Sequence, residues 1–206
     1  MPKIKNKLSG LYNLNPISME AVVEYQNCEI GEPFIIMLKV PSEVDKFIDD
    51  NKHYTKSNIN VCYAAPRSLK NPRNWYETQL NVSANVRRKK GYPIKGVPFF
   101  VVTDDGYGFM AHTTSDNNKQ FAAVGDELIL GKWIKERLVS EGLVSPVDNT
   151  LNDKERKGMI TKEMLNSYGC NAIAFQKTAL MIADPEEPKN RYEVWTLKLI
   201  LVDTEE

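Results

Sequence analysis

Histidine is nearly missing from this sequence, and cysteine is scarce. The 206-residue chain has two histidines and three cysteines, which are His53, His112, Cys28, Cys62 and Cys170. Two imidazoles cannot build a histidine-rich metal site or supply several general bases, so many enzyme mechanisms lack their usual groups. Three widely spaced cysteines do not form a disulfide scaffold, and we expect reduced thiols that act as small buried apolar residues.

Long hydrophobic runs are missing as well. The longest ones, such as residues 33–38 and 197–202, are far shorter than the roughly 18 to 20 apolar residues of a membrane-spanning helix. The basic start, residues 1–5, is followed by polar residues and lacks the apolar run of a secretory signal. We therefore expect a cytoplasmic protein without a membrane segment, whose 42% hydrophobic residues can bury one sizeable core.

An excess of charge of one sign is also absent, because 27 Lys and Arg residues balance 27 Asp and Glu residues. The charges are nevertheless spread unevenly along the chain. Residues 67–95 contain eight Lys and Arg residues and a single acid, Glu77, whereas acids gather after residue 184. This distribution is compatible with a protein that binds a polyanion on one face while another face keeps it dissolved.

The spacing of apolar residues predicts mostly strands. Residues 99–103 and 107–114, joined by Asp104-Asp105-Gly106, predict a β-hairpin, because Asp and Gly tolerate the positive φ of such turns. The turn also explains the two aspartates better than a metal site does. Further strands are expected over 33–40 with both faces buried, over 59–63, near 121–124, around 173–175 and over 192–202.

Three short helices are predicted by apolar residues at helical spacing. The first covers residues 42–48, with Ser42 as its N-cap. The second contains residues 130–138, and the third starts after Thr161 and ends at Gly169. Many strands with few, short helices indicate a mainly β fold, an open barrel and not a doubly wound sheet.

We find no internal repeat and no low-complexity tract that would divide the chain. We therefore expect a single domain over residues 1–206, in which about residues 1–15 form a loosely specified N-terminal segment.

Residues 66–97 show no clean periodicity and predict a long functional loop, or arm. This arm combines the basic run 87–90 with several hydrogen-bonding side chains. Arginine and lysine neutralise phosphates and pair with guanine, while Asn and Gln suit adenine and Glu can accept from cytosine. The run 87–90 alone is explained equally well by a solvated surface. The combination of cations and hydrogen-bonding side chains on one arm, however, suits contact with both the bases and the phosphate backbone of a nucleic acid.

Two other functions are left open by the residues. A compact metal-dependent nuclease would use Asp148, Glu155 and Lys157, although these residues fall in a charged loop without a strand pattern. The His-x-Lys pattern of phospholipase-D-type nucleases fails, because His53 is followed by lysine only at Lys56. The other alternative is a β-barrel that binds a protein and whose basic arm only keeps it dissolved.

The order of several motifs resembles a known family. The motifs are Asn74-Trp75, Arg87-Arg88, Tyr92-Pro93-Ile94, residues 99–106, Asn117-Asn118-Lys119, residues 129–138, residues 160–169 and a terminal strand. Over about residues 74–202 this order resembles the C-terminal DNA-recognition domain of phospholipase-D-type, NgoFVII-like restriction endonucleases. The resemblance implies a seven-stranded-type open pseudobarrel of the plant B-three type, in which two arms clasp duplex DNA in the major groove.

When the two arms of the family are transferred to this sequence, the resemblance places one arm at about residues 74–92 and the other at about 115–120. It implies a chain without catalytic, metal or cofactor residues that recognises a specific sequence in double-stranded DNA for a type II restriction endonuclease. The family's nuclease domain, normally upstream, is absent from this sequence, so we expect an excised domain or a relative with another effector. The partners would be duplex DNA and a nuclease domain or subunit, at the nucleoid of a bacterial cytoplasm. The expected DNA contacts are Arg73, Asn74, Trp75, Glu77, Gln79, Asn81, Arg87, Arg88, Lys89, Lys90, Ser115, Asp116, Asn117, Asn118, Lys119 and Gln120.

Overall fold

The computed structural model describes residues 14–48, 57–66 and 71–203. It divides into two compact units. The first unit comprises Met1–Ile36, Asn81–Glu127 and Ile173–Leu199, and the second comprises Met37–Leu80, Leu128–Ala172 and Ile200–Glu206. The single domain over residues 1–206 stays a prediction.

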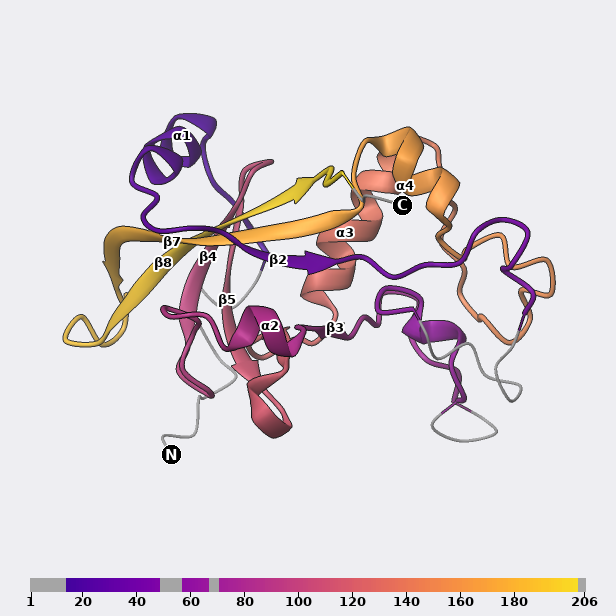
Figure 1. Ribbon diagram of the computed structural model, residues 1–206, viewed down its shortest axis with the longest axis horizontal. Helices are drawn as coiled ribbons and strands as arrows, with labels where there is room; N and C mark the ends of the chain where they lie inside the picture. Colours follow the sequence, from indigo (N-terminus) through magenta and orange to yellow (C-terminus); the bar gives the residue numbers. More distant parts are fainter. Residues whose placement is uncertain (1–13, 49–56, 67–70, 204–206) are drawn as a thin grey trace. The chain divides into compact units, whose positions relative to one another are not determined.

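One β-sheet forms the framework of the first unit (Figure 1). Its strands are β1 (Asn15–Pro16), β2 (Phe34–Met37), β3 (Leu80–Asn81), β4 (Phe99–Thr103), β5 (Tyr107–Thr114), β6 (Gln120–Ala123), β7 (Ala172–Ala183) and β8 (Arg191–Ile200). Seven strands follow the order β2-β7-β8-β4-β5-β6-β3, and β1 pairs with β5. The sheet is nearly closed into a barrel with an open seam. The prediction of a mainly β, seven-stranded open barrel with short helices is confirmed.

The predicted hairpin is the center of this sheet. Strands β4 and β5 pair antiparallel, whereas β4 and β8 pair in parallel, with Val101 opposite Trp195. Gly106 in the connecting turn has φ +86°, a conformation that glycine adopts without steric cost. The hydroxyl of Thr103 donates to Asp105 at 2.6 Å and accepts the N–H of Tyr107 at 2.9 Å. Asp105 therefore serves the turn, as its place in the sequence predicts.

Aromatic rings fill the interior of the sheet. The buried rings belong to Phe34, Phe99, Phe121, Phe175 and Trp195, which come from five different strands. Their centroids lie 5.2 to 6.0 Å apart in the contacts that join them, within the range at which aromatic pairs stabilise a core. Trp195 is therefore a core residue of the first unit.

A helix near the start of the chain covers another part of the first unit. Helix α1 (Met19–Asn27) begins after Ser18, whose hydroxyl accepts the N–H of Ala21 at 3.2 Å. Its Val22 is buried in a cluster with Phe100, Met110 and other apolar residues of the sheet. Neither α1 nor the two-residue strand β1 is among the predicted elements.

The second unit contains helices η2 (Val61–Tyr63), α3 (Ile129–Ser140) and α4 (Lys162–Tyr168). The predicted helices at 130–138 and after Thr161 are confirmed, and Gly169 ends α4 in the left-handed region with φ +85°. In α3, Trp133 is buried, and a charged residue, Lys135, is fully buried as well. Gly131 of this helix is required by close packing, because a Cβ there would lie 1.6 Å from the carbonyl oxygen of Tyr76.

Lys135 and Cys62 meet in the interior of the second unit. The ammonium group of Lys135 lies 3.6 Å from the sulfur of Cys62, donates to the carbonyl of Trp75 and sits 4.9 Å from the center of the Trp75 ring. Burial lowers the pKa of Lys135 and raises the pKa of the Cys62 thiol. Cys62 and Cys170 are buried as predicted, whereas Cys28 is only half-buried.

Two predicted strands differ from the structure. Strand β2 exists, but its burial alternates, with Phe34 and Ile36 buried and Met37 exposed, because one face packs on the aromatic interior. The prediction that both of its faces are buried is wrong. Residues 59–63 do not form a strand, because residues 61–63 are a 3₁₀ helix. There the side chain of Asn60 forms hydrogen bonds with the backbone of Ile160, in place of the backbone hydrogen bonds that a strand would form.

The predicted helix at 42–48 is also wrong. Ser42 does accept the N–H of Asp45 at 3.2 Å, as an N-cap would, but only a series of turns follows. The apolar residues whose spacing predicted the helix, Val44, Phe47 and Ile48, are 86%, 55% and 63% exposed. Because these side chains cover no apolar surface, so short an amphipathic segment is not stabilised as a helix.

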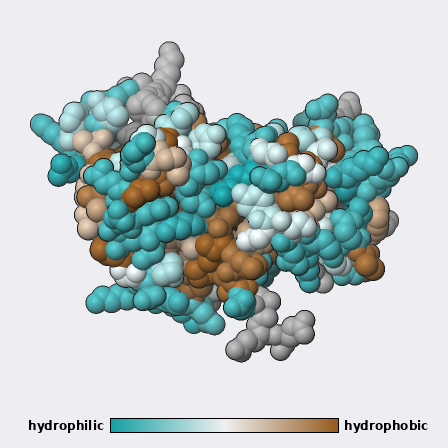
Figure 2. All heavy atoms as spheres, turned by 90° about the horizontal axis from the view of Figure 1, so that it is seen from above, coloured by the Kyte–Doolittle hydropathy of each residue, from teal (hydrophilic) through white to brown (hydrophobic). Residues whose placement is uncertain are grey.

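Hydrophilic side chains cover most of the face drawn in Figure 2, and hydrophobic ones gather in a few patches. None of the helices in the described part of the chain combines the length and apolar character that a membrane crossing requires.

Candidate nucleic-acid interface

The second predicted arm is a tight loop that leads from β5 to β6 in the first unit. It contains the 3₁₀ helix η3 (Asp116–Asn118), and Ser115, Asn117 and Asn118 have positive φ values of 68°, 54° and 57°. Asparagine adopts this left-handed region more readily than most residues. Asp116, Asn117 and Lys119 are exposed. The loop therefore presents polar groups from a compact backbone.

The basic run of the first arm surrounds the end of a short helix, α2 (Ala84–Arg87). Arg88 is the C-cap, and its N–H donates to the carbonyl of Ala84 at 3.2 Å. Arg88, Lys89 and Lys90 are exposed, whereas Arg87 is half-buried and donates to the carbonyl of Val82 at 3.3 Å.

Hydrogen bonds join these two arms within the first unit. The N–H of Val82 donates to the carbonyl of Lys119 at 2.6 Å, and the side-chain amide of Asn118 donates to the carbonyl of Pro93 at 2.8 Å. The hydroxyl of Tyr92 donates to the carbonyl of Asn118 at 3.3 Å. We call this joined surface the basic platform. Its cations are Arg87, Arg88, Lys89, Lys90, Lys95 and Lys119.

Tyr92 fixes the platform to the interior of the barrel. Its ring packs edge-on against Phe34 and Phe175, with centroids 5.5 and 6.1 Å away. Burial raises the pKa of Tyr92 to about 12, although the nearby charge of Arg87 acts in the opposite direction. The hydroxyl therefore keeps its proton at neutral pH and remains a donor. In the sequence, Tyr92 stands out only as part of the motif Tyr92-Pro93-Ile94, which does not indicate this anchoring role.

The exposed cations of the platform are available for a ligand. Among the residues that the structure describes, no acid forms an ion pair with Arg88, Lys89, Lys90 or Lys119. The platform also contains an acceptor without a protein partner in that part of the chain, the buried Oδ1 of Asn118. A surface of unpaired cations beside hydrogen-bonding side chains suits a polyanion that carries further polar groups.

Several other predicted contacts of the first arm lie in the second unit. Arg73 pairs with Glu77 at 2.5 Å and donates to the carbonyl of Ala65 at 2.9 Å. Trp75 is buried, and its indole N–H donates to the carbonyl of Gly158 at 2.7 Å.

Three further predicted contacts keep exposed positions. Asn74 and Gln79 are exposed in the second unit, while Asn81 is exposed in the first. The half-buried Ser115 and Gln120 stand at the two ends of the second arm. Arg67 and Lys70, which contribute to the basic excess in the sequence, lie outside the described residues.

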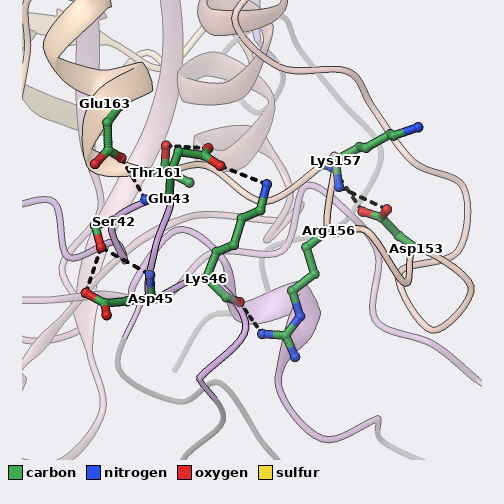
Figure 3. A network of polar contacts seen from close by, with 10 residues as sticks. Ser42, Glu43, Asp45, Lys46, Asp153, Arg156, Lys157, Thr161 and Glu163 are labelled. Atoms are coloured by element: carbon green, nitrogen blue, oxygen red, sulfur yellow. Dashed lines mark hydrogen bonds and ion pairs between the residues drawn. The ribbon is translucent and has the colours of Figure 1, made fainter.

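The charged loop at residues 145–158 belongs to a polar network in the second unit (Figure 3). Glu43 pairs with Lys46 at 2.8 Å and accepts the hydroxyl of Thr161 at 3.0 Å. Glu163 in turn accepts the backbone N–H of Glu43 at 2.9 Å. These carboxylates are engaged in holding the turn at residues 43–47 against the start of α4.

Asp153 has a similar role within this loop. Its carboxylate accepts the hydroxyl of Tyr63 at 2.5 Å and the N–H groups of Lys157 and Gly158 at 3.0 and 2.9 Å. Burial acts to raise the pKa of Asp153, but these hydrogen bonds outweigh it and hold the pKa below its usual value. The geometry is that of a loop organised around an ionised carboxylate.

Two residues of the nuclease alternative pair with each other at the protein surface. Glu155 and Lys157 pair with each other at 2.7 Å, and their side chains are 73% and 72% exposed. Within residues 14–48, 57–66 and 71–203, no three His, Cys, Asp or Glu side chains gather so that they could hold a metal ion. His53 and Lys56 lie outside these ranges.

A comparison with protein-family models matches residues 33–168 to the NgoFVII C-terminal B3-like DNA-binding domain. The chain belongs to this family. The match to the NgoFVII-type domain starts well before residue 74, where the resemblance was expected to begin, and stops short of residue 202. It includes both arms of the basic platform. A search of curated proteins finds no match.

Proposed function

We propose that this NgoFVII-type domain recognises a specific sequence in double-stranded DNA through two arms in the major groove. One arm is the segment around α2, and the other is the loop at residues 115–120. Family membership supports DNA binding. The observation that carries the proposal is that the two arms are hydrogen-bonded to each other and present exposed cations on one platform.

The chemistry of the platform suits both parts of recognition. The side chains of Lys89 and Lys90 have no ion-pair partner among the described residues and are suited to phosphate contacts, which fix position without reading sequence. Arg88 can pair with the O6 and N7 edge of guanine, and Asn117 with adenine. Such a division would make some contacts specific for a base and others indifferent to it.

The domain would serve as the target-recognition part of a type II restriction endonuclease and leave cleavage to a nuclease domain or subunit. The DNA-binding character of the family supports this division of labor. A protein with this role would work in the bacterial cytoplasm, at the nucleoid.

Duplex binding should depend strongly on salt. If about five platform cations displace counterions, the logarithm of the binding constant should fall with the logarithm of salt concentration with a slope of about −4. Fluorescence anisotropy of a labelled short duplex, measured from low to physiological salt without divalent metal, gives this slope. A nearly flat titration would contradict polyanion binding and favour the protein-binding alternative.

A further inference from the structure

The turn that follows the basic run carries two exposed apolar side chains on the basic platform. Ile94 is 73% exposed and Val97 is 49% exposed, on either side of Lys95 and Gly96. Isolated apolar residues are common on protein surfaces. This pair follows the exposed cations 88–90 in the sequence, and its turn is hydrogen-bonded to Asn118 of the second arm.

The turn is held firmly in place. The carbonyl of Pro93 accepts the amide of Asn118 at 2.8 Å and the hydroxyl of Thr113 at 3.3 Å. The N–H of Gly96 donates to the carbonyl of Thr113 at 2.8 Å, and the N–H of Val97 donates to the carbonyl of Ile94 at 3.1 Å. Ile94 is therefore presented to solvent by a fixed backbone, which is the condition for a specific contact.

The surroundings of Ile94 indicate what would cover it. Lys95 follows it directly, and the same Asn118 that anchors the turn belongs to the second arm. Lysine is depleted at the center of protein–protein interfaces, so an apolar protein partner fits this charge poorly. Duplex DNA fits it better, because its major groove combines negative phosphates with one exposed apolar group, the C5-methyl of thymine.

We propose that Ile94, with Val97 beside it, contacts the C5-methyl group of a pyrimidine in the target duplex and so helps to determine specificity. This inference rests on the proposed function, because it assigns a base contact within the same platform. The methyl group can belong to thymine or to 5-methylcytosine, which present the same apolar group at the same ring position. The apolar contact would complement the polar contacts that Arg88 and Asn117 are suited to make.

The test uses duplexes that the protein selects from a random library. In each selected duplex, every thymine is replaced singly by uracil, which removes only the C5-methyl, and every cytosine singly by 5-methylcytosine, which adds it. Wild-type protein should lose about fivefold in affinity at one uracil position, or gain a similar factor at one 5-methylcytosine position, as expected for one buried methyl group. The first result identifies thymine as the source of the methyl, and the second identifies 5-methylcytosine.

Ile94→Ala should abolish this methyl dependence and leave the response to all other base changes intact. Ile30→Ala, at an exposed position of the same unit, is the matched control and should keep the dependence. Binding without any methyl dependence, or a dependence that is equal in wild type and Ile94→Ala, would overturn this inference alone. An equal loss for methylated and unmethylated duplexes would also overturn it, as would be expected if Ile94 only supports the fold or meets a protein. Failure to bind any duplex would overturn the proposed function and this inference together.

Discussion

Replacing Arg88 and Lys89 together by alanine is expected to weaken duplex binding about 30-fold at low salt. Both side chains are exposed on the basic platform, and neither has an ion-pair partner in the described part of the chain. Each phosphate contact that is lost should also make the salt slope shallower by about 1. Anisotropy titrations of wild type and variant at several salt concentrations measure both effects.

The matched control removes two cations from another part of the same unit. Lys189, in the connection between β7 and β8, and Arg191, at the start of β8, are exposed, and acidic residues surround them in the sequence. Lys189→Ala with Arg191→Ala changes the net charge by the same amount and should leave the affinity within about twofold. Equal weakening by the two double variants would mean that net charge, and not the platform, accounts for binding.

Asn60→Ala is expected to lower the free energy of unfolding by about 4 kcal/mol. The Asn60 side chain is fully buried, donates to the carbonyl of Ile160 at 2.8 Å and accepts the N–H of Ile160 at 2.9 Å. Alanine would leave both backbone groups buried without partners, and each such group costs roughly 1 to 3 kcal/mol. Urea denaturation followed by tryptophan fluorescence measures the change.

Asn152→Ala provides the comparison for this variant, because Asn152 is exposed in the charged loop of the same unit. Its effect should stay within about 0.5 kcal/mol, as is typical of surface positions. A loss below about 1 kcal/mol for Asn60→Ala would contradict the assignment of Asn60 as the side chain that joins residues 57–63 to residue 160.

The parts of the fold that depend on local sequence could be predicted. The β4–β5 hairpin follows from alternating apolar residues around a turn that needs glycine at positive φ, and α3 from the spacing of its buried residues. The helix expected at 42–48 fails because its apolar residues have no surface to cover. The strand expected at 59–63 fails because Asn60 pairs with a residue 100 positions away. Neither the missing surface at 42–48 nor the distant partner of Asn60 can be recognised from the local pattern.

The candidate site shows the same division between local and distant information. The basic run and the hydrogen-bonding side chains near it are visible as composition, whereas the second arm at 115–120 is implied by the family resemblance. The contacts that join the two arms through Val82, Tyr92 and Asn118 could not be predicted, because they are hydrogen bonds between segments distant in the sequence. Trp75 is predicted as a DNA contact because it stands among hydrogen-bonding side chains in the first arm. Instead, its indole is buried and bonded to Gly158.

Selection from a library of random duplexes tests sequence-specific recognition most directly. The full chain is incubated with the library at physiological salt without divalent metal, and bound duplexes are recovered, amplified and sequenced over several rounds. We expect one short common sequence to emerge, bound at least 10³-fold more tightly than unrelated DNA, as specific DNA-binding proteins do. Retention of DNA without enrichment of any sequence would contradict specific recognition, and no retention of DNA at all would contradict the account as a whole.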